Sequence, residues 1–113
     1  MSDCIFCKII NKEIPSTIVY EDEDVLAFND VNPQAPVHIL IIPKKHISDM
    51  TEVTEQDLGI IGKIHLVAIK LANEKCFADQ GFRLVNNCKE DGGQVVFHLH
   101  YHLMAGKKLP VCT

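Results

Sequence analysis

Three histidines at every second position are the residues of this sequence best suited to chemistry. His98, His100 and His102 alternate with apolar residues in the segment 95–104. Successive side chains of a β-strand point to opposite faces, so a strand places all three imidazoles on one face, about 7 Å apart. Neutral imidazoles can act as metal ligands, acid–base groups or nucleophiles. The spacing therefore predicts a reactive centre on one face of a strand.

A second group of candidate residues lies near the N-terminus. Cys4 and Cys7 have a C-x-x-C spacing, which suits two thiolates on one tetrahedral metal ion, with a redox pair as the alternative. A zinc site needs two further ligands. His46 directly follows the apolar segment 37–42 and is either one of these ligands or an exposed loop histidine.

Three further features are compatible with a ligand site or with ordinary structure. Asp30 follows an expected strand and is either a turn former or a ribose-binding carboxylate. His38 is the one polar residue of an apolar strand, where a histidine is more often a packed core residue than a ligand. Gly92 and Gly93 allow a backbone close to a phosphate oxygen, but they also suit a plain hairpin turn.

The pattern along the chain predicts the elements that position these residues. Strands are expected at 17–20, 25–28, 37–42, 81–86 and 95–104, a short helix after Cys4, and a long helix from Thr51 to about Cys76. Thr51 or Thr54 is the expected N-cap, with Glu55 in the first turn. We therefore predict an α+β fold with a five-stranded antiparallel sheet, forming a single domain over residues 1–113.

Composition limits the class of protein. The chain has 113 residues, of which 47% are hydrophobic and 23% charged, with a net charge of −4, so we expect a globular domain that binds no nucleic acid. No apolar run approaches the ~20 residues that a membrane helix needs. Five cysteines without an export signal favour a reducing compartment, the cytoplasm first and the nucleus as a further possibility.

The segment 98–104 resembles the His-x-His-x-His signature of the histidine triad (HIT) superfamily. Segments 5–10, 13–15, 32–38, 42–47 and 91–94 are similar to its nucleotide-binding branch, called Hint, so the resemblance reaches to about Gly106. It implies a homodimer in which two five-stranded sheets join into one of ten strands.

The resemblance also implies an activity. It implies hydrolysis of purine nucleoside 5′-phosphoramidates to AMP or GMP and an amine, through a nucleotidyl intermediate on His100 and with His102 as the second catalytic residue. The alternatives are a dinucleoside polyphosphate hydrolase and a non-catalytic nucleotide-binding module that recruits a partner protein.

Site residues follow from the same resemblance. The expected nucleotide-binding residues are Ile5, Phe6, Ile9, Ile14, Phe28, Asp30, Val31, His38, Asn87, Gly93, Gln94, Val95, His100 and His102. The expected ligands of a structural zinc are Cys4, Cys7, His46 and His98. Two features depart from the family pattern: Val95 stands where a serine is common, and the chain has no C-terminal tryptophan.

Overall fold

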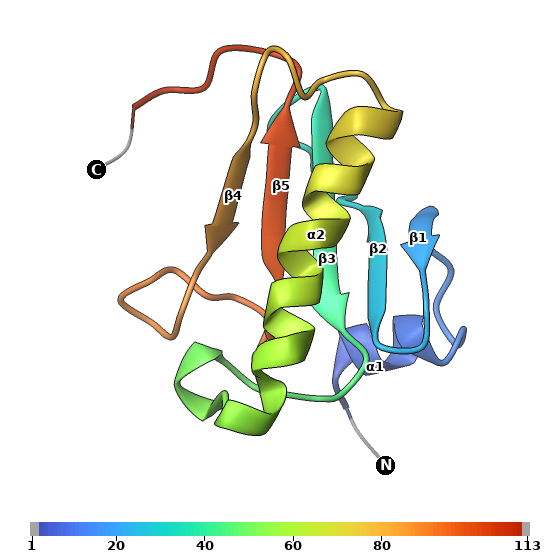
Figure 1. Cartoon of the computed structure of the whole chain (residues 1–113). Helices are drawn as coiled ribbons and strands as arrows, with labels where there is room; N and C mark the ends of the chain where they lie inside the picture. The colour runs from blue at the N-terminus through green and yellow to red at the C-terminus, as the bar shows by residue number, and fades with distance from the viewer. Residues whose placement is uncertain (1–2, 112–113) are drawn as a thin grey trace.

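A five-stranded antiparallel sheet forms the centre of the molecule, as the sequence predicts. The computed structural model describes residues 3–111. Its strands lie in the order β1 (Ile18–Glu21), β2 (Val25–Asn29), β3 (Val37–Pro43), β5 (Tyr101–Ala105) and β4 (Arg83–Asn86). The long helix α2 (Leu58–Glu74) crosses one face of the sheet, and the short helix α1 (Ile5–Ile10) packs near one end of the other face (Figure 1).

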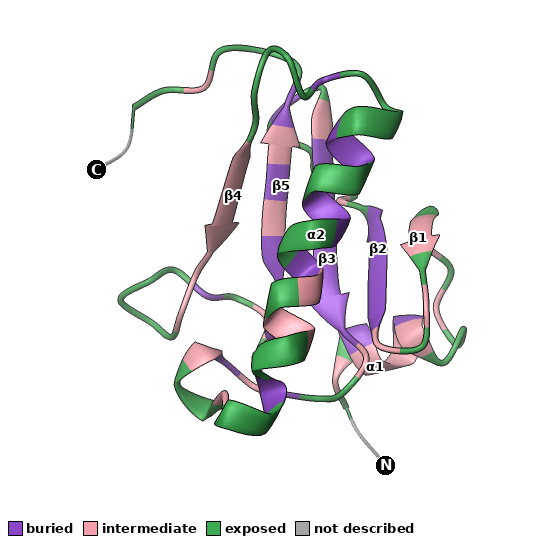
Figure 2. Ribbon diagram, viewed as in Figure 1, coloured by how far each residue is buried: buried purple, intermediate pink, exposed green. Residues whose placement is uncertain are grey.

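The two faces of the sheet carry separate apolar clusters. In β3, Ile39 and Ile41 pack with the helix α2, whereas Leu40 and Ile42 pack with Phe6 and the other apolar residues of α1. Because helices cover both faces, the central strands have almost no solvent-exposed residues (Figure 2). This explains why segment 37–42 reads as a nearly continuous apolar run.

The strand that carries the histidines is shorter than the sequence predicts. It begins at Tyr101, not at residue 95, so only His102 of the three histidines lies within it. The backbone before Tyr101 does not take part in regular strand pairing. The amide of Leu99 instead donates to the carbonyl of Ile47 at 2.6 Å. The two histidines before the strand nevertheless share one side, since His98 and His100 both contact the ring of Phe6.

The long helix also begins later than predicted, at Leu58, and ends at Glu74. Two short 3₁₀ turns, Met50–Glu52 and Glu55–Asp57, precede it. The carboxylate of Asp49 accepts the amide of Thr51 at 2.8 Å, and the carboxylate of Asp57 accepts the amide of Thr54 at 3.0 Å. Aspartate side chains compete in this way with helical backbone bonds, which accounts for the turns.

Within residues 3–111, no helix is both long and apolar enough to cross a membrane.

Candidate active site

A cavity of about 560 Å³ opens on the face of the sheet that carries α1. Its walls come from α1, the end of β2, the loop 30–36, β3, the loop before β5 and β5 itself. Predicted nucleotide-binding residues make up most of its wall: Ile5, Phe6, Ile9, Ile14, Phe28, Asp30, Val31, Asn87, Gly93, Val95, His100 and His102. The structure thus brings together residues that lie almost a hundred positions apart in the sequence.

Two of the predicted residues, His38 and Gln94, do not line this cavity. His38 is buried behind His102. The carboxamide of Gln94 turns into its own loop, where Oε1 accepts the amide of Lys89 at 2.8 Å and Nε2 donates to the carbonyls of Ser48 and Val96. Gln94 therefore braces the loop that carries Gly93 and Val95.

Gly92 allows this loop to close on itself. A Cβ at Gly92 would lie 2.4 Å from the carbonyl oxygen of Cys88, closer than real Cβ atoms approach. The carboxamide of Asn87 donates to the carbonyl of Gly92 at 2.8 Å. Gly93 has a φ of 82°, in the left-handed region that favours glycine. These contacts give Gly92 and Gly93 separate reasons to be glycine.

His100 has one ring nitrogen fixed by the backbone. Its Nδ1 lies 2.8 Å from the carbonyl oxygen of His98. A carbonyl oxygen only accepts, so Nδ1 carries the proton and Nε2 keeps its lone pair. His100 is only 6% exposed, and burial lowers its pKa from the ordinary histidine value. At neutral pH His100 is therefore an uncharged nitrogen base.

His102 has the opposite tautomer, which a short chain of hydrogen bonds sets. The amide of Gln34 donates to Nδ1 of His38 at 3.0 Å, so Nε2 of His38 carries a proton. That nitrogen lies 2.9 Å from Nδ1 of His102, which must accept. Neutral His102 consequently carries its proton on Nε2 and offers a donor to a ligand.

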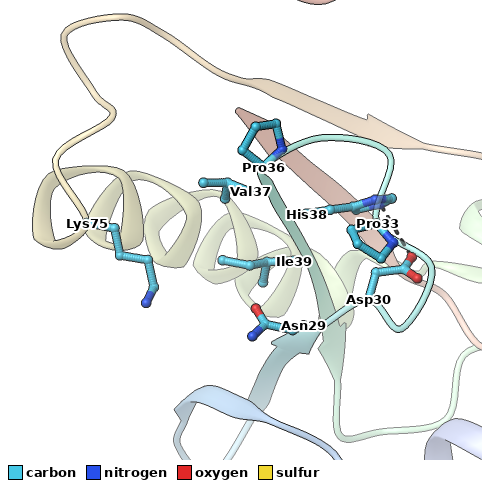
Figure 3. A pocket seen from close by; sticks show the side chains of 8 residues that line it. All are labelled: Asn29, Asp30, Pro33, Pro36, Val37, His38, Ile39 and Lys75. Atoms are coloured by element: carbon cyan, nitrogen blue, oxygen red, sulfur yellow. Dashed lines mark ion pairs between the residues drawn. The ribbon is translucent and has the colours of Figure 1, made fainter. Parts of the chain in front are cut away.

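Burial and neighbouring imidazoles keep His102 neutral. Desolvation, with smaller contributions from His100 and His38, lowers the pKa of His102 to about 4. Asp30 acts in the other direction, and its Oδ2 lies 3.4 Å from Nε2 of His38. Figure 3 shows the side chains of Asp30 and His38 pointing toward one another.

The four predicted metal ligands form a cluster beside the cavity. Sγ of Cys4, Sγ of Cys7 and one ring nitrogen each of His46 and His98 all lie within 4.8 Å of one another. Nδ1 of His98 is 3.3 Å from Sγ of Cys4, and Nδ1 of His46 is 3.4 Å from Sγ of Cys7. Nε2 of His98 bonds to the carbonyl of Pro43 at 2.8 Å, which leaves its Nδ1 lone pair toward the sulfurs.

These distances test whether the cluster fits zinc. Zn–S bonds of about 2.3 Å and Zn–N bonds of about 2.05 Å give tetrahedral S···N edges of about 3.5 Å and N···N edges of about 3.3 Å. The Nδ1 atoms of His46 and His98 lie 3.2 Å apart, close to the expected N···N edge. Two sulfurs and two nitrogens at these separations fit a tetrahedral ion.

Sequence reasoning missed part of the cavity wall: Pro15, Ser16, Asn29, Asn32, Gln34, Leu40 and Val96. Leu40 could have been predicted from the sequence. It pairs with Phe28 in the neighbouring strand, and directly paired residues lie on the same face of a sheet. Ser16 carries no such signal. Its hydroxyl oxygen is the one buried side-chain nitrogen or oxygen of residues 3–111 that has no hydrogen-bond partner.

Comparison with known proteins gives consistent matches over the length of the chain. The family model of the HIT domain matches residues 11–109. The purine nucleoside phosphoramidase of Escherichia coli K12 is 46% identical over 107 residues, which cover 95% of this chain and 90% of that protein. A histidine triad protein from Clostridium difficile superposes with a TM-score of 0.96 at 57% identity, covering 100% of this chain and 98% of the other. For a HIT family hydrolase from Legionella pneumophila the TM-score is 0.93 at 46% identity, with 96% of each chain covered.

Proposed function

This chain belongs to the HIT domain family, and on that premise we propose that it hydrolyses the P–N bond of purine nucleoside 5′-phosphoramidates. The products are AMP or GMP and an amine. The observation that carries the proposal is neutral His100 in the wall of a nucleotide-sized cavity, with its Nε2 lone pair available for attack. The phosphoramidase from E. coli supports the choice of bond.

The cavity offers a separate contact for each part of a nucleotide. The base packs among the apolar side chains of α1 and Phe28, which form the apolar end of the cavity. The carboxylate of Asp30 accepts hydrogen bonds from the ribose hydroxyls. The phosphate lies near Asn87 and the backbone amide of Val95, which serves without the hydroxyl that a serine at position 95 would provide. The amide of Gly93 donates to the carbonyl of Glu90 at 3.0 Å, which holds the loop in shape.

The reaction proceeds in two steps. Nε2 of His100 attacks the phosphorus in line with the leaving nitrogen, the P–N bond breaks, and a nucleotidyl-histidine forms. The nitrogen departs as an amine only after it is protonated. The bound phosphate anion favours the imidazolium form of His102, whose Nε2–H is the proton donor in the cavity wall. Water then attacks the phosphorus and gives a proton back to His102, which cleaves the P–N bond to His100 and releases the nucleoside monophosphate.

We propose that Cys4, Cys7, His46 and His98 hold a structural zinc ion. A zinc ion with four protein ligands supplies no open coordination position and so stabilises the fold without taking part in hydrolysis. The site joins the start of α1 to the loop before β5, because Cys4 and Cys7 belong to the first and His98 to the second. Thiolate ligands must remain reduced, which favours the cytoplasm.

We also propose that the protein is a homodimer. The strand β4 lies at an edge of the sheet, and pairing it with β4 of a second copy gives a continuous ten-stranded sheet. The outer face of α2 carries exposed Leu66 and Ile69, which a second copy would cover.

Replacement of His100 tests the proposed reaction. His100→Asn removes the nucleophile but keeps a polar side chain, so turnover of adenosine 5′-phosphoramidate should fall by at least about 10³-fold while AMP binding persists. Release of AMP is measured by liquid chromatography and binding by calorimetry. In the wild type, rapid quenching above neutral pH and mass spectrometry should find the adenylyl group on the peptide that contains His100.

The matched control is His65→Asn, which changes an exposed histidine of α2 and should leave turnover intact. Two outcomes contradict the proposal: full turnover by the His100 variant, and wild-type cleavage of diadenosine polyphosphates with none of the phosphoramidate.

A further inference from the structure

A second cavity, of about 260 Å³, continues from the candidate active site toward the edge strand β4. It shares four lining residues with the larger cavity, His102 and Asn87 among them. Its own walls come from β4 and the end of β5. The complete lining is Asp30, Gln34, His38, Arg83, Val85, Asn87, His102 and Met104.

The register of the sheet places this second cavity in line with the proposed nucleotide. Phe28 pairs with Leu40, Leu40 with His102, and His102 with Val85. Side chains of directly paired residues lie on the same face, so these four form a row across four strands. Within one copy, a nucleotide with its base at Phe28 and its phosphate at His102 leaves only β4 beyond the phosphate, and β4 is the edge that we propose to pair with a second copy.

The leaving amine therefore has a defined place if the proposed function is correct. In-line attack requires the leaving nitrogen to lie on the far side of phosphorus from His100. The base and ribose occupy the side of β2 and β3, so the amine extends over Val85 and Met104. These side chains present an apolar surface to it.

Arg83 stands at the end of this surface. It pairs with Met104, one step of two residues, or about 7 Å, beyond the pair of Val85 and His102. Arg83 is the only arginine of the chain. Among residues 3–111 no carboxylate forms an ion pair with it, and its guanidinium donates one hydrogen bond to the carbonyl of Pro110.

A guanidinium has five N–H donors in a planar fork that matches a carboxylate. The one acidic wall residue, Asp30, is within ion-pair distance of His38. We infer that the cavity over β4 binds the leaving amine, and that Arg83 selects amines that carry a carboxylate a few methylene groups from the nitrogen. This inference rests on the proposed function and names its substrate class.

A pair of matched substrates tests the inference. Adenosine 5′-phosphoramidates of 4-aminobutyrate and of its neutral amide differ in charge but hardly in size. For the wild type, we expect kcat/KM to be about ten- to a hundredfold higher for the carboxylate, the range that a charged hydrogen bond gives. In Arg83→Gln the ratio should fall to near one, with the amide turned over as by the wild type.

Lys70→Gln is the control for long-range charge, because Lys70 lies on α2, which covers the other face of the sheet, and its loss changes the net charge equally. It should keep the wild-type ratio. A role of Arg83 in holding the C-terminal segment alone would lower turnover of both substrates together.

Equal kcat/KM for the two substrates in the wild type, or an unchanged ratio in Arg83→Gln, would overturn the inference. Unsubstituted adenosine 5′-phosphoramidate separates this failure from failure of the proposed function. If the wild type cleaves it, only the role of Arg83 is lost. If the wild type cleaves none of the three compounds, the proposed hydrolase activity and the inference fall together.

Discussion

Backbone groups set the tautomers of the two histidines that we propose for catalysis. The carbonyl of His98 holds the proton of His100 on Nδ1, and the amide of Gln34 acts on His102 through His38. The two rings lie with centroids 5.1 Å apart. His100 presents a lone pair, as a nucleophile needs, and His102 presents an N–H that can donate a hydrogen bond to a phosphate anion.

The low pKa of His102 predicts how stability depends on pH. Unfolding returns its pKa from about 4 to about 6.5, so between these values the unfolded chain binds more protons than the folded one. The free energy of unfolding should therefore decrease as pH falls from 6.5 to 4. His102 contributes at most about 3 kcal/mol to this decrease, and less after solvent screening of its partly exposed ring.

Urea unfolding at several pH values measures the effect. His102→Gln should show a shallower loss of stability between pH 6.5 and 4 than the wild type, whereas His65→Gln, at an exposed position, should follow the wild type. Parallel curves for the wild type and the His102 variant would mean that His102 is not held neutral by the fold.

At the level of residues, sequence reasoning succeeded where identity and spacing determine position. Alternation brought His98 and His100 to the same side, and the C-x-x-C spacing brought Cys4 and Cys7 to one cluster. It did not find the direction of the Gln94 carboxamide or the unpartnered hydroxyl of Ser16. Both depend on which backbone groups surround a side chain, and these groups come from distant parts of the chain.

Among the elements, α1 has the most demanding position. It is only six residues long, too short to be stable by itself. Phe6 packs its ring against those of His98 and His100, with centroids 5.9 and 5.1 Å away. The helix thus supplies one wall of the cavity, and through Phe6 it contacts the proposed metal ligand His98 and the proposed nucleophile His100.

We therefore expect loss of zinc to loosen α1 and weaken nucleotide binding. Cys7→Ser should lower the zinc content from about one ion per chain, speed amide exchange in residues 4–10 and raise the Kd for AMP, because Ile5 and Phe6 line the cavity. Elemental analysis, hydrogen exchange and calorimetry provide the three measurements.

Cys76→Ser makes the same substitution at an exposed position after α2 and should change none of the three. A wild-type protein purified without chelators that contains no zinc, and that Cys7→Ser leaves unaltered, would contradict the metal assignment.

Element boundaries were less predictable than the elements themselves. The strands at 25–28 and 37–42 were predicted almost to the residue, because their apolar runs are buried on both faces. The last strand and the long helix were predicted to begin too early. In both cases side chains of adjacent residues bond to backbone groups, as Asp49 does before the helix, and periodicity contains no information on such bonds.

At the scale of the whole molecule, the outer face of α2 is unusually apolar for a surface. Leu66 is 66% exposed and Ile69 is 49% exposed, and Phe82 near the start of β4 is 40% exposed. A Cβ at Gly62, one turn before Leu66, would contact nothing within 4 Å. A small residue beside large apolar ones suits close approach of a second helix.

Leu66→Glu should convert the proposed dimer to a monomer, because two copies would bury like charges against each other across the symmetry axis. Light scattering coupled to gel filtration measures the mass. Ile18→Glu places the same charge on the opposite edge strand β1 and should leave the mass unchanged. A wild-type mass of about 12.7 kDa would show that the face is not used for self-association.

The distance in sequence between α1 and its contacts has a consequence for biosynthesis. Phe6 emerges from the ribosome 92 residues before His98, its ring partner. At about 5–20 residues per second, the apolar side of α1 waits roughly 5–20 s before the last strand arrives to cover it. During that interval the nascent chain exposes Phe6 and Ile9, so a chaperone that binds apolar segments would be needed first at the N-terminal helix.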